Sequence, residues 1–575
     1  MLHFIDYEVT TYDWLCVIIN PITKTKTEIV NNVDQLHDYY DKYKNEIFIG
    51  YNIRGYDQYI MKGLLLGMQP QKINDFIIKE HKRGYQYSKD FNNIPLNIYE
   101  VMFGGNSLKK LEGFMGDNII ESKVSFDIDH PLTDSEIKEL LYYCTNDVLA
   151  LIKVFLERKS EFDSHLALIK EFNLPLNYVG KTQAQLAASI LGAVKQNYDD
   201  EWEIRLPKEL ELHKYKYIAD WFIDKKNQNY ESSLTTTVCG VEHTFAYGGG
   251  HGAIPNLVYE CKPNEIMIMS DIAQMYPHLM TKHNLMSRSV TKPERYEYIL
   301  SESLRLKALK KKKEREPYKR ICNISYGATG DEFNAMYDPL HRNLVCVYGQ
   351  VLMVMLLEEL EEKVKSFRLL QNNTDGILYI IDVKDFDLVD DITYQWEQKT
   401  HLTMEFDYFK KVIQGDVNNY IAIEPDGSYK AKGSYFKELS TIDNDLPIVN
   451  KAIKNYLIKN IPVEKTIYEC DDLMQFQQIV KISSKYLYAV YNGKVLNEKT
   501  LRVFASKDNR DGTLYKVKNV KGNLRSEKTA ATPINAFIYN DSVQGVKCPE
   551  KLDKQWYVDL AYYRINKKIP DIINE

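Results

Sequence analysis

The chain has 575 residues, of which 44% are hydrophobic and 27% are charged, and this predicts a globular protein of about two to four domains. Its net charge of −6 gives no sign of a nucleic-acid-binding protein, so such a function would require a local basic surface. The eight cysteines form no C-x-x-C pair, which argues against a zinc module and favours a reducing compartment.

The sequence shows no targeting or membrane-spanning segment. The N-terminal stretch MLHFIDYEVTTYDW has acids at positions 6 and 8 and no apolar segment, so it does not predict a signal peptide. No apolar run reaches membrane-spanning length, and VLMVMLLEELEEK indicates an amphipathic helix that turns acidic. We therefore expect a cytoplasmic protein without a membrane partner.

Acidic residues mark three elements in the first 160 residues. LHFIDYEVTT predicts a strand in which Asp6 and Glu8 share one face. The two acids would repel each other unless a cation lay between them, and a solvated edge strand is the alternative. The strand IFIGY leads through Gly55 to Asp57, which opens a helix and could be a plain N-cap.

The third acidic element is the amphipathic helix predicted over SEIKELLYYCTNDVLALIKVFLERK. Tyr143 and Asp147 lie one turn apart on it. An aspartate on this partly apolar face would be costly without a partner. Together the three patterns, D-x-E, N-x-x-x-Y-D and Y-x-x-x-D, resemble the 3′–5′ exonuclease domain of family B DNA polymerases, of the DEDDy type.

The resemblance implies an RNase H-like domain whose acids Asp6, Glu8, Asp57 and Asp147 hold two Mg²⁺ ions. Tyr143 would orient the attacking water. Motifs of the family that bind single-stranded DNA have counterparts that the resemblance assigns to Asn52, Ser107, Leu108 and Lys123. Val9 departs from the threonine that often stands there.

A second acidic pair lies in the middle of the chain. EIMIMSDIAQMYPHLMTKHN predicts a buried strand ending at Asp271, a tight loop and a helix after Pro277; a plain loop aspartate is the alternative. FRLLQNNTDGILYIID predicts a hairpin whose turn carries Asp375, followed by Gly376, with both residues able to adopt positive φ.

Between these segments the sequence predicts two helices. The first spans about 294 to 314, and Pro317 suits the N1 position of the second. Lys319 and Asn323 lie one turn apart on the second helix, with Tyr326 one turn further on. The run from Lys310 to Lys313 is interpreted as a solvated face.

These segments resemble the polymerase motifs of family B. The palm motif corresponds to D-I-A-Q-M-Y-P, the fingers motif to KRICNISYG and the hairpin motif to N-T-D, where Asn373 replaces the first Asp. The resemblance implies two Mg²⁺ ions, with Mn²⁺ as a substitute, held by Asp271, Asp375 and Ile272. It also implies that Tyr276 excludes a 2′-hydroxyl. The nucleotide-binding candidates are Lys319, Asn323, Tyr326, Arg305 and Lys307, and Gly327 would permit close approach.

Two further segments resemble DNA-contacting elements of the family. FAYGGGHGAIPN matches Y-x-G-G, which implies that Tyr247, Gly249 and Gly250 approach template phosphates; a flexible linker is the alternative. VNNYIAIEPDGSYKAKGSYFK resembles the primer-gripping K-x-Y element. Further DNA-binding candidates in this region and the hairpin turn are Tyr420, Lys432 and Thr374. Asn418 replaces the lysine of the K-x-Y element, and Lys430 and Lys432 would compensate.

The implied architecture is a multi-domain α/β (α+β) protein: an RNase H-like exonuclease followed by a right-hand polymerase. We expect the exonuclease at 1–160, a connecting, template-binding region at 161–255 and the palm at 256–292 and 328–435. The fingers would span 293–327, with a thumb and C-terminal region at 436–575. To this last region the sequence assigns no chemistry.

The expected function is DNA-directed DNA synthesis with proofreading, as in compact bacteriophage and mobile-element members of family B. The expected partners are primed DNA template, dNTPs and phage replication proteins such as a single-strand-binding protein and a helicase. We expect the chain to be a monomer in the bacterial cytoplasm. The alternatives are a nuclease or DNA-binding protein with a weakened polymerase site, a protein-primed polymerase and a reverse-transcriptase-like enzyme.

Overall fold

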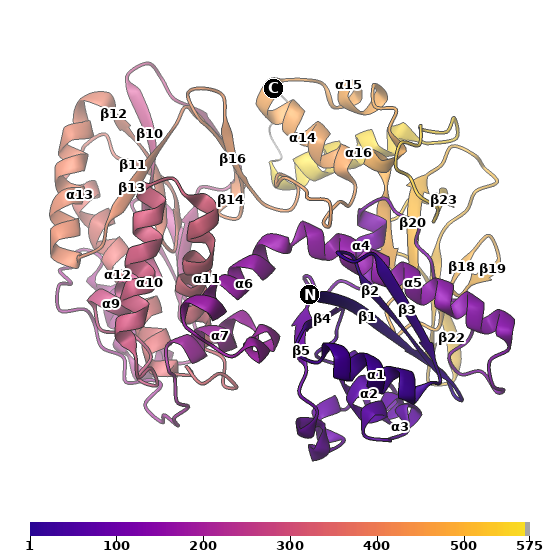
Figure 1. The fold of residues 1–575 in the computed structure, drawn as a ribbon. Helices are drawn as coiled ribbons and strands as arrows, with labels where there is room; N and C mark the ends of the chain where they lie inside the picture. Colours follow the sequence, from indigo (N-terminus) through magenta and orange to yellow (C-terminus); the bar gives the residue numbers. More distant parts are fainter. Residues whose placement is uncertain (570–575) are drawn as a thin grey trace. The chain divides into compact units, whose positions relative to one another are not determined.

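The apolar strands of the N-terminal region form a five-stranded sheet in the computed structural model, which describes residues 1–569 (Figure 1). The order is β3-β2-β1-β4-β5, and the central strand β1 runs antiparallel to β2 and parallel to β4. The strands are β1 (Leu2–Val9), β2 (Trp14–Asn20), β3 (Thr25–Val30), β4 (Ile47–Gly50) and β5 (Asn97–Glu100). Ile5, Tyr7 and Val9 pack into the core on one face of the sheet. Because side chains alternate along a strand, Asp6 and Glu8 face the other side.

Helices cover this sheet. The helices of this region are α1 (Val33–Tyr43), α2 (Asp57–Leu65), α3 (Pro70–Asn74), α4 (Leu108–Phe114), α5 (Asp134–Glu157) and α6 (Lys159–Glu171). The buried residues of α1 to α3 join the core behind β1, and α5 packs against β1 and β2. The predicted helices after Asp57 and around Asp147 are therefore confirmed, and both acids lie on elements that contact β1.

Two small sheets from the C-terminal region complete this unit. One has the order β17-β20-β23 and the other β19-β18-β21-β22. The strands are β17 (Gln478–Lys481), β18 (Tyr488–Tyr491), β19 (Lys494–Leu496), β20 (Thr500–Ala505), β21 (Tyr515–Val520), β22 (Asn523–Lys528) and β23 (Ala536–Ile538), and helix α15 (Val463–Tyr468) precedes them. β17 and β20 contact α4, so this region supports a helix of the N-terminal part.

A seven-stranded sheet, β13-β10-β12-β11-β8-β7-β6, forms the centre of a second unit. Its strands are β6 (Leu234–Val238), β7 (Val241–Ala246), β8 (Gly249–Ala253), β10 (Glu265–Ile272), β11 (Arg368–Asn373), β12 (Gly376–Asp382) and β13 (Met404–Phe409). The smaller sheet β16-β15-β14-β9 contains β9 (Leu257–Glu260), β14 (Lys411–Asp416), β15 (Asn419–Ile423) and β16 (Tyr429–Lys432). The predicted strand at Asp271 and the predicted hairpin at Asp375 are both present.

The second unit contains most of the remaining helices. These are α7 (Gln183–Ile190), α8 (Lys216–Ile223), α9 (Met275–Lys282), α10 (Pro293–Ala308), α11 (Lys312–Ala328), α12 (Pro339–Lys363) and α13 (Phe386–Thr400). Helices α14 (Pro447–Lys459) and α16 (Lys554–Lys568) follow later in the chain. The prediction that Pro317 begins a helix is wrong, because Lys310 turns the chain with a φ of 55° and α11 already begins at Lys312.

Helix α12 corrects the expectation of an amphipathic helix. By length and composition it could cross a membrane, but 94% of its most apolar stretch is buried inside the protein. Apolar residues cover all sides of α12 because strands and helices surround it, including β8, α9 and α13. It is a core helix, and a helix that is hydrophobic all round is typical of that position.

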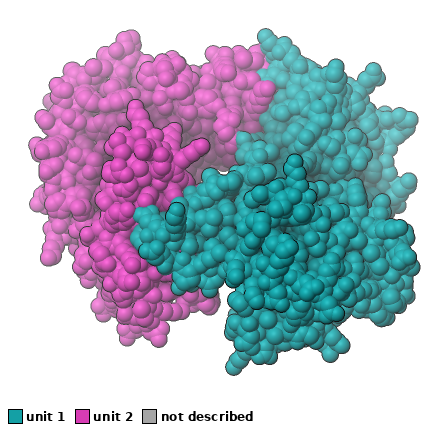
Figure 2. Space-filling view, in the orientation of Figure 1, with its two compact units in different colours: residues 1–181, 439–449, 464–559 teal, residues 182–438, 450–463, 560–575 magenta. Residues whose placement is uncertain are grey.

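The predicted multi-domain α/β class is confirmed, with 40% helix and 23% strand. Unit 1 comprises residues 1–181, 439–449 and 464–559, and unit 2 comprises 182–438, 450–463 and the segment that begins at Leu560 (Figure 2). The region expected to form a thumb, 436–575, is thus divided between the units, and most of it belongs to unit 1 with the first 181 residues.

Candidate active sites

Four carboxylates converge in unit 1 from three elements. Asp6 and Glu8 come from β1, Asp57 from the first position of α2 and Asp147 from α5. Asp57 accepts a hydrogen bond from the Tyr7 N–H at 3.3 Å, which ties α2 to the strand between the two other acids. The structure therefore brings together the acids that the sequence placed far apart.

The charges of these carboxylates are poorly compensated. Burial raises the pKa of Asp6, and Glu8, Asp57 and Asp147 raise it further. Burial likewise raises the pKa of Glu8 well above its usual value and that of Asp57 to about 7. Such mutual repulsion disappears when a divalent cation binds, and an all-oxygen donor set is the one that Mg²⁺ prefers. The residues present fit a magnesium site.

Cys144 also lies at this site and was not predicted. Its Sγ and one carboxylate oxygen each of Asp6 and Glu8 lie within 4.8 Å of one another. Burial raises the pKa of the Cys144 thiol well above its usual value, and the thiol contacts the Asp6 carboxylate at 3.7 Å. Cys144 is therefore a neutral hydrogen-bond donor to Asp6 rather than a soft thiolate ligand.

Lys109 of α4 is a second residue that the sequence prediction missed. Its ammonium forms an ion pair with Asp147 and another with Glu112 at 3.3 Å. Burial alone would lower its pKa, but the two carboxylates outweigh burial and raise it. The Lys109 Nζ also lies 4.4 Å from the centroid of the Tyr143 ring. A permanent cation thus joins α4 to the carboxylate cluster.

Tyr143 lies on α5, one turn before Asp147. Burial, followed by the charge of Asp147, raises the pKa of its hydroxyl far above the usual value. The hydroxyl therefore stays protonated at neutral pH, and it can orient a water molecule but cannot act as a base there.

The residues of unit 1 that were expected to bind single-stranded DNA differ in their placement. Asn52 has a φ of 64°, and its N–H donates to Glu100 at 2.7 Å. Ser107 precedes α4, its hydroxyl is buried, and no described residue bonds to it. Leu108 opens α4, one residue before Lys109.

Lys123 does not join the carboxylates. Its side chain is 83% exposed and pairs with Glu139 at 3.4 Å. The cation at the cluster is Lys109 instead, which lies on a helix packed against α5.

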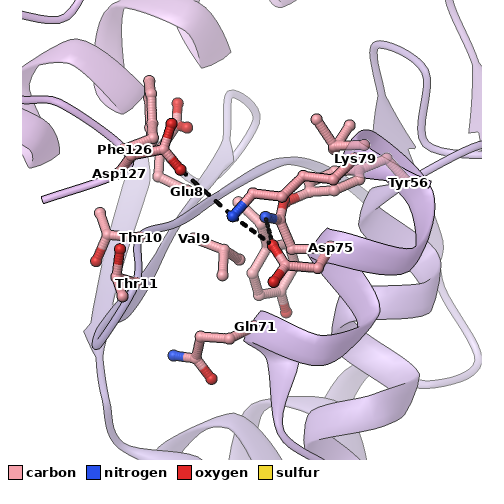
Figure 3. Close-up of a pocket in the computed structure, with 13 residues that line it drawn as sticks. Glu8, Val9, Thr10, Thr11, Tyr56, Gln71, Asp75, Lys79, Phe126 and Asp127 are labelled. Atoms are coloured by element: carbon pink, nitrogen blue, oxygen red, sulfur yellow. Dashed lines mark hydrogen bonds and ion pairs between the residues drawn. The ribbon is translucent and has the colours of Figure 1, made fainter. Parts of the chain in front are cut away.

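A pocket of about 420 Å³ opens beside Glu8 (Figure 3). Its wall combines aromatic rings, amides and hydroxyls. These are Thr10, Thr11, Tyr56, Gln71, Asn74 and Phe126. Lys79 spans the pocket between Asp75 and Asp127, with N–O distances of 3.1 and 3.4 Å. Asp75–Lys79 is a π-helical turn, a rare conformation that often occurs at functional sites.

In unit 2 the strand-end acid and the hairpin acid meet. Asp271 lies directly opposite Gly376 in the ladder between β10 and β12, and the Ile272 N–H donates to the Asp375 carbonyl at 2.7 Å. Burial raises the pKa of Asp271 to about 6, with Asp375 adding to the effect. Burial also raises the pKa of Asp375. Two adjacent carboxylates, Asp271 half-buried and Asp375 exposed at the turn, again fit a magnesium site.

The hairpin turn differs from the prediction in its backbone. Neither Asp375 nor Gly376 has a positive φ. Gly376 is needed for another reason: a Cβ atom there would collide with the Asp271 carboxylate. The Thr374 N–H donates to the Gly250 carbonyl at 2.9 Å, so the turn is held from β8.

The glycine segment is part of the sheet and not a linker. Gly249 and Gly250 begin β8, where Gly249 has a φ of 143°. Tyr247 is only 2% exposed, and its hydroxyl donates to the Phe222 carbonyl at 2.7 Å. Its side chain therefore stabilises the unit, and only its backbone is left for a DNA contact.

Asn373, the departure from the family motif, is opposite His251 in the pairing of β11 with β8. His251 is exposed and belongs to the segment GGGHGA. The sequence prediction did not single it out, because the pairing of β8 with β11 joins residues far apart in the chain.

Tyr276 and Tyr326 stack on each other. Their ring centroids are 4.1 Å apart, with an interplanar angle of 17°. Burial raises the pKa of the Tyr276 hydroxyl, and the charge of Asp375 contributes. The stack therefore joins the helix after Asp271 to α11.

On α11, Lys319, Asn323 and Gly327 form one exposed stripe at helical spacing. No carboxylate of the described residues lies within ion-pair distance of Lys319. Arg305 and Lys307, by contrast, are paired with Glu302 and Glu405.

The primer-gripping candidates lie close to the acids. Tyr420 and Lys432 are directly opposite each other in the β15–β16 ladder. Lys432 lowers the pKa of Asp375 against the effect of burial, and Lys430 does the same for Asp271. Lys430 also pairs with Asp407.

No protein-family model matches the sequence, and no curated protein matches it. Function must therefore be inferred from the geometry of the two sites.

Proposed function

We propose that the chain is a DNA-directed DNA polymerase with a 3′–5′ exonuclease. The observation that carries the proposal is the pairing of Asp271 with the turn of Asp375. The β10–β12 register and the Ile272–Asp375 hydrogen bond bring a half-buried acid and an exposed acid together. Tyr276 of the palm motif and Lys319, Asn323 and Tyr326 of the fingers motif lie on α9 and α11 of the same unit. Tyr420 and Lys432 of the K-x-Y element lie on its strands β15 and β16.

In the polymerase site each group has a distinct task. Divalent cations held by Asp271 and Asp375 would lower the pKa of the primer 3′-hydroxyl and neutralise the leaving pyrophosphate. Lys319 supplies an unpaired, flexible ammonium for the triphosphate. Tyr276, fixed by its stack on Tyr326, presents a rigid ring where a 2′-hydroxyl would clash.

The carboxylates of unit 1 support the exonuclease half of the proposal. Asp6, Glu8, Asp57 and Asp147 form the acidic site, and Tyr143 orients the attacking water through a hydroxyl that stays protonated. The adjacent pocket offers aromatic and amide groups to a terminal nucleoside.

Two variants test the assignment of the two activities. Asp375→Asn should abolish extension of a primed DNA template and leave degradation of single-stranded DNA intact. The double variant Asp6→Ala/Glu8→Ala should do the reverse. Both reactions are followed on a 5′-labelled primer with Mg²⁺, with and without dNTPs. Equal loss of both activities in both variants would contradict the two-site assignment.

A second candidate function is a nuclease with a weakened polymerase site. Asn373 and Asn418 favour it, because both replace residues of the family motifs. The Asn418 N–H is bonded to the Asp416 carboxylate at 2.9 Å, so its backbone shapes the β14–β15 turn. Degradation of the labelled primer without any extension at saturating dNTP would favour this candidate.

A further inference from the structure

The C-terminal part of unit 1 carries a concentration of positive charge that neither proposed site uses. Residues 481–528 contain twelve lysines and arginines against four acids, in a chain whose net charge is −6. Much of this charge lies on the hairpin of β21 and β22, which has four lysines, one arginine and one acid, Glu527. β22 is an edge strand of its sheet.

Glu527 is already engaged. It accepts a hydrogen bond from the Tyr486 hydroxyl and pairs with Lys516 at 3.3 Å and Lys518 at 3.2 Å. The two lysines also lie over the Tyr486 ring, with Nζ 4.4 and 5.6 Å from its centroid. One carboxylate cannot neutralise two ammonium groups, so a positive charge remains beside the ring.

The other cations of the hairpin have no acidic partner. No carboxylate of the described residues lies within ion-pair distance of Lys521, Arg525 or Lys528. Arg525 is directly opposite Lys518 in the ladder. Like charges in directly opposed positions destabilise a sheet, and an anion between them removes that penalty. Lys518 shares Glu527 with Lys516, so an anionic ligand beside Arg525 would relieve the repulsion that remains.

Exposed apolar groups accompany the charges. Tyr515 is 40% exposed and directly opposite Lys528, and Leu524 is 61% exposed. Side chains alternate along the strands, so Tyr515, Leu524 and Lys528 share one face of the hairpin. A ring beside cations suits an unpaired base with its phosphate, whereas a closed duplex offers no base face.

We propose that the β21–β22 hairpin binds single-stranded DNA that crosses the edge strand β22. Lys521 at the turn, Lys528 on the face of Tyr515 and Arg525 on the opposite face would bind phosphates, and Tyr515 would stack against a base. The proposal deepens the exonuclease function and rests on it, because that function makes a single strand the substrate of unit 1. The hairpin would hold the strand at a second point, apart from the catalytic acids.

The test is fluorescence anisotropy of the full-length chain with labelled oligo(dT) of about 20 nucleotides, in EDTA so that no strand is degraded. The triple variant Lys521→Ala/Arg525→Ala/Lys528→Ala should bind about tenfold more weakly near 0.1 M salt. The slope of log K against log salt should fall by about 2, because each phosphate contact on a single strand contributes about 0.7. Tyr515→Ala should weaken binding at least about fivefold without changing the slope.

Lys24→Ala is the matched control for Lys521→Ala. Both lysines are exposed, stand in hairpin turns and have a positive φ, 55° and 53°. Only Lys521→Ala should lower the salt slope, by about 0.7. A triple variant with the wild-type slope would overturn the proposal. Lysines on an edge strand can also serve to prevent pairing with other chains. A triple variant that aggregates but binds DNA with the wild-type affinity would support that role and overturn the proposal.

Two comparisons separate this proposal from the exonuclease assignment. The triple variant should hydrolyse the p-nitrophenyl ester of thymidine 5′-monophosphate at the wild-type rate, because this substrate is too short to reach a second contact. Asp6→Ala/Glu8→Ala should lose that hydrolysis and keep the salt slope. If the wild type cleaved neither substrate, the exonuclease assignment would be contradicted. The slopes of log K against log salt would still test whether the hairpin binds DNA. Equal affinity for a duplex of the same length would overturn the single-strand assignment.

Discussion

Gly376 lies directly opposite Asp271 in the β10–β12 ladder, and a Cβ atom at position 376 would collide with the Asp271 carboxylate. The residue after the hairpin acid is therefore restricted by the acid on the neighbouring strand, because only a hydrogen atom leaves room for the Asp271 side chain between the two strands. This contact couples the two halves of the proposed polymerase site through packing alone.

We predict that Gly376→Ala lowers primer extension at least about a hundredfold, because a displacement of catalytic groups by about 1 Å has an effect of that size. Degradation of single-stranded DNA, which the proposed function assigns to unit 1, should remain. Steady-state extension and exonuclease assays on the same preparation measure both. The matched control is Gly248→Ala, where the new Cβ atom meets open space, and normal extension by Gly376→Ala would contradict the close approach.

The second prediction concerns Lys109. Its replacement by alanine removes the cation that pairs with Asp147 and Glu112. The buried acids would then repel one another more strongly, so the exonuclease rate should fall about a hundredfold, with primer extension unchanged. Lys110→Ala is the control, because that ammonium lies over the Phe114 ring at 5.2 Å from the centroid. Equal rates for both variants would show that Lys109 has no part in the site.

The elements that carry the motifs could be predicted from sequence, because their signals are local. Alternation placed Asp6 and Glu8 on one face of β1, and helical spacing placed Tyr143 and Asp147 on one face of α5. The hairpin at Asp375 followed from its turn residues. The positive φ expected there was wrong, because the glycine preference comes from Asp271, on a strand far away in the chain.

The partners across long sequence separations could not be predicted. Lys109 reaches Asp147 only because α4 packs against α5, whereas Lys123, which stood in a matching motif, points to solvent. The association of residues 464–559 with the N-terminal part also has no sequence signal. It depends on contacts such as those of Arg502, which no local pattern announces.

The third prediction follows from those contacts. Arg502 is fully buried, and its guanidinium donates to the carbonyls of Asp117 and Asp541 at 2.6 Å and of Gly113 at 3.2 Å. Burial lowers its pKa to about 10, so it remains charged at neutral pH. Arg502→Leu would leave these carbonyls unsatisfied.

The free energy of unfolding of unit 1 should therefore fall by at least about 3 kcal/mol. The change is measured by urea denaturation, with hydrogen exchange of the α4 amides as the readout of unfolding. Arg510→Leu, at an arginine whose side chain is 89% exposed and pairs with Asp508, should change it little. Equal stabilities of the two variants would show that Arg502 does not hold the C-terminal sheets to α4.

The last prediction concerns the pH dependence of stability in unit 2. His243 is fully buried on β7, and burial lowers its pKa below 6.5, with nearby His251 acting in the same direction. Below pH 6.5 the unfolded chain therefore binds a proton that the folded chain resists, so stability falls as the pH falls from 7 toward 5.

His243→Gln should make this fall less steep, whereas His401→Asn, at an exposed histidine in a left-handed turn, should not. Thermal unfolding at several pH values measures both slopes, and equal slopes for wild type and His243→Gln would exclude His243 as a source of acid sensitivity.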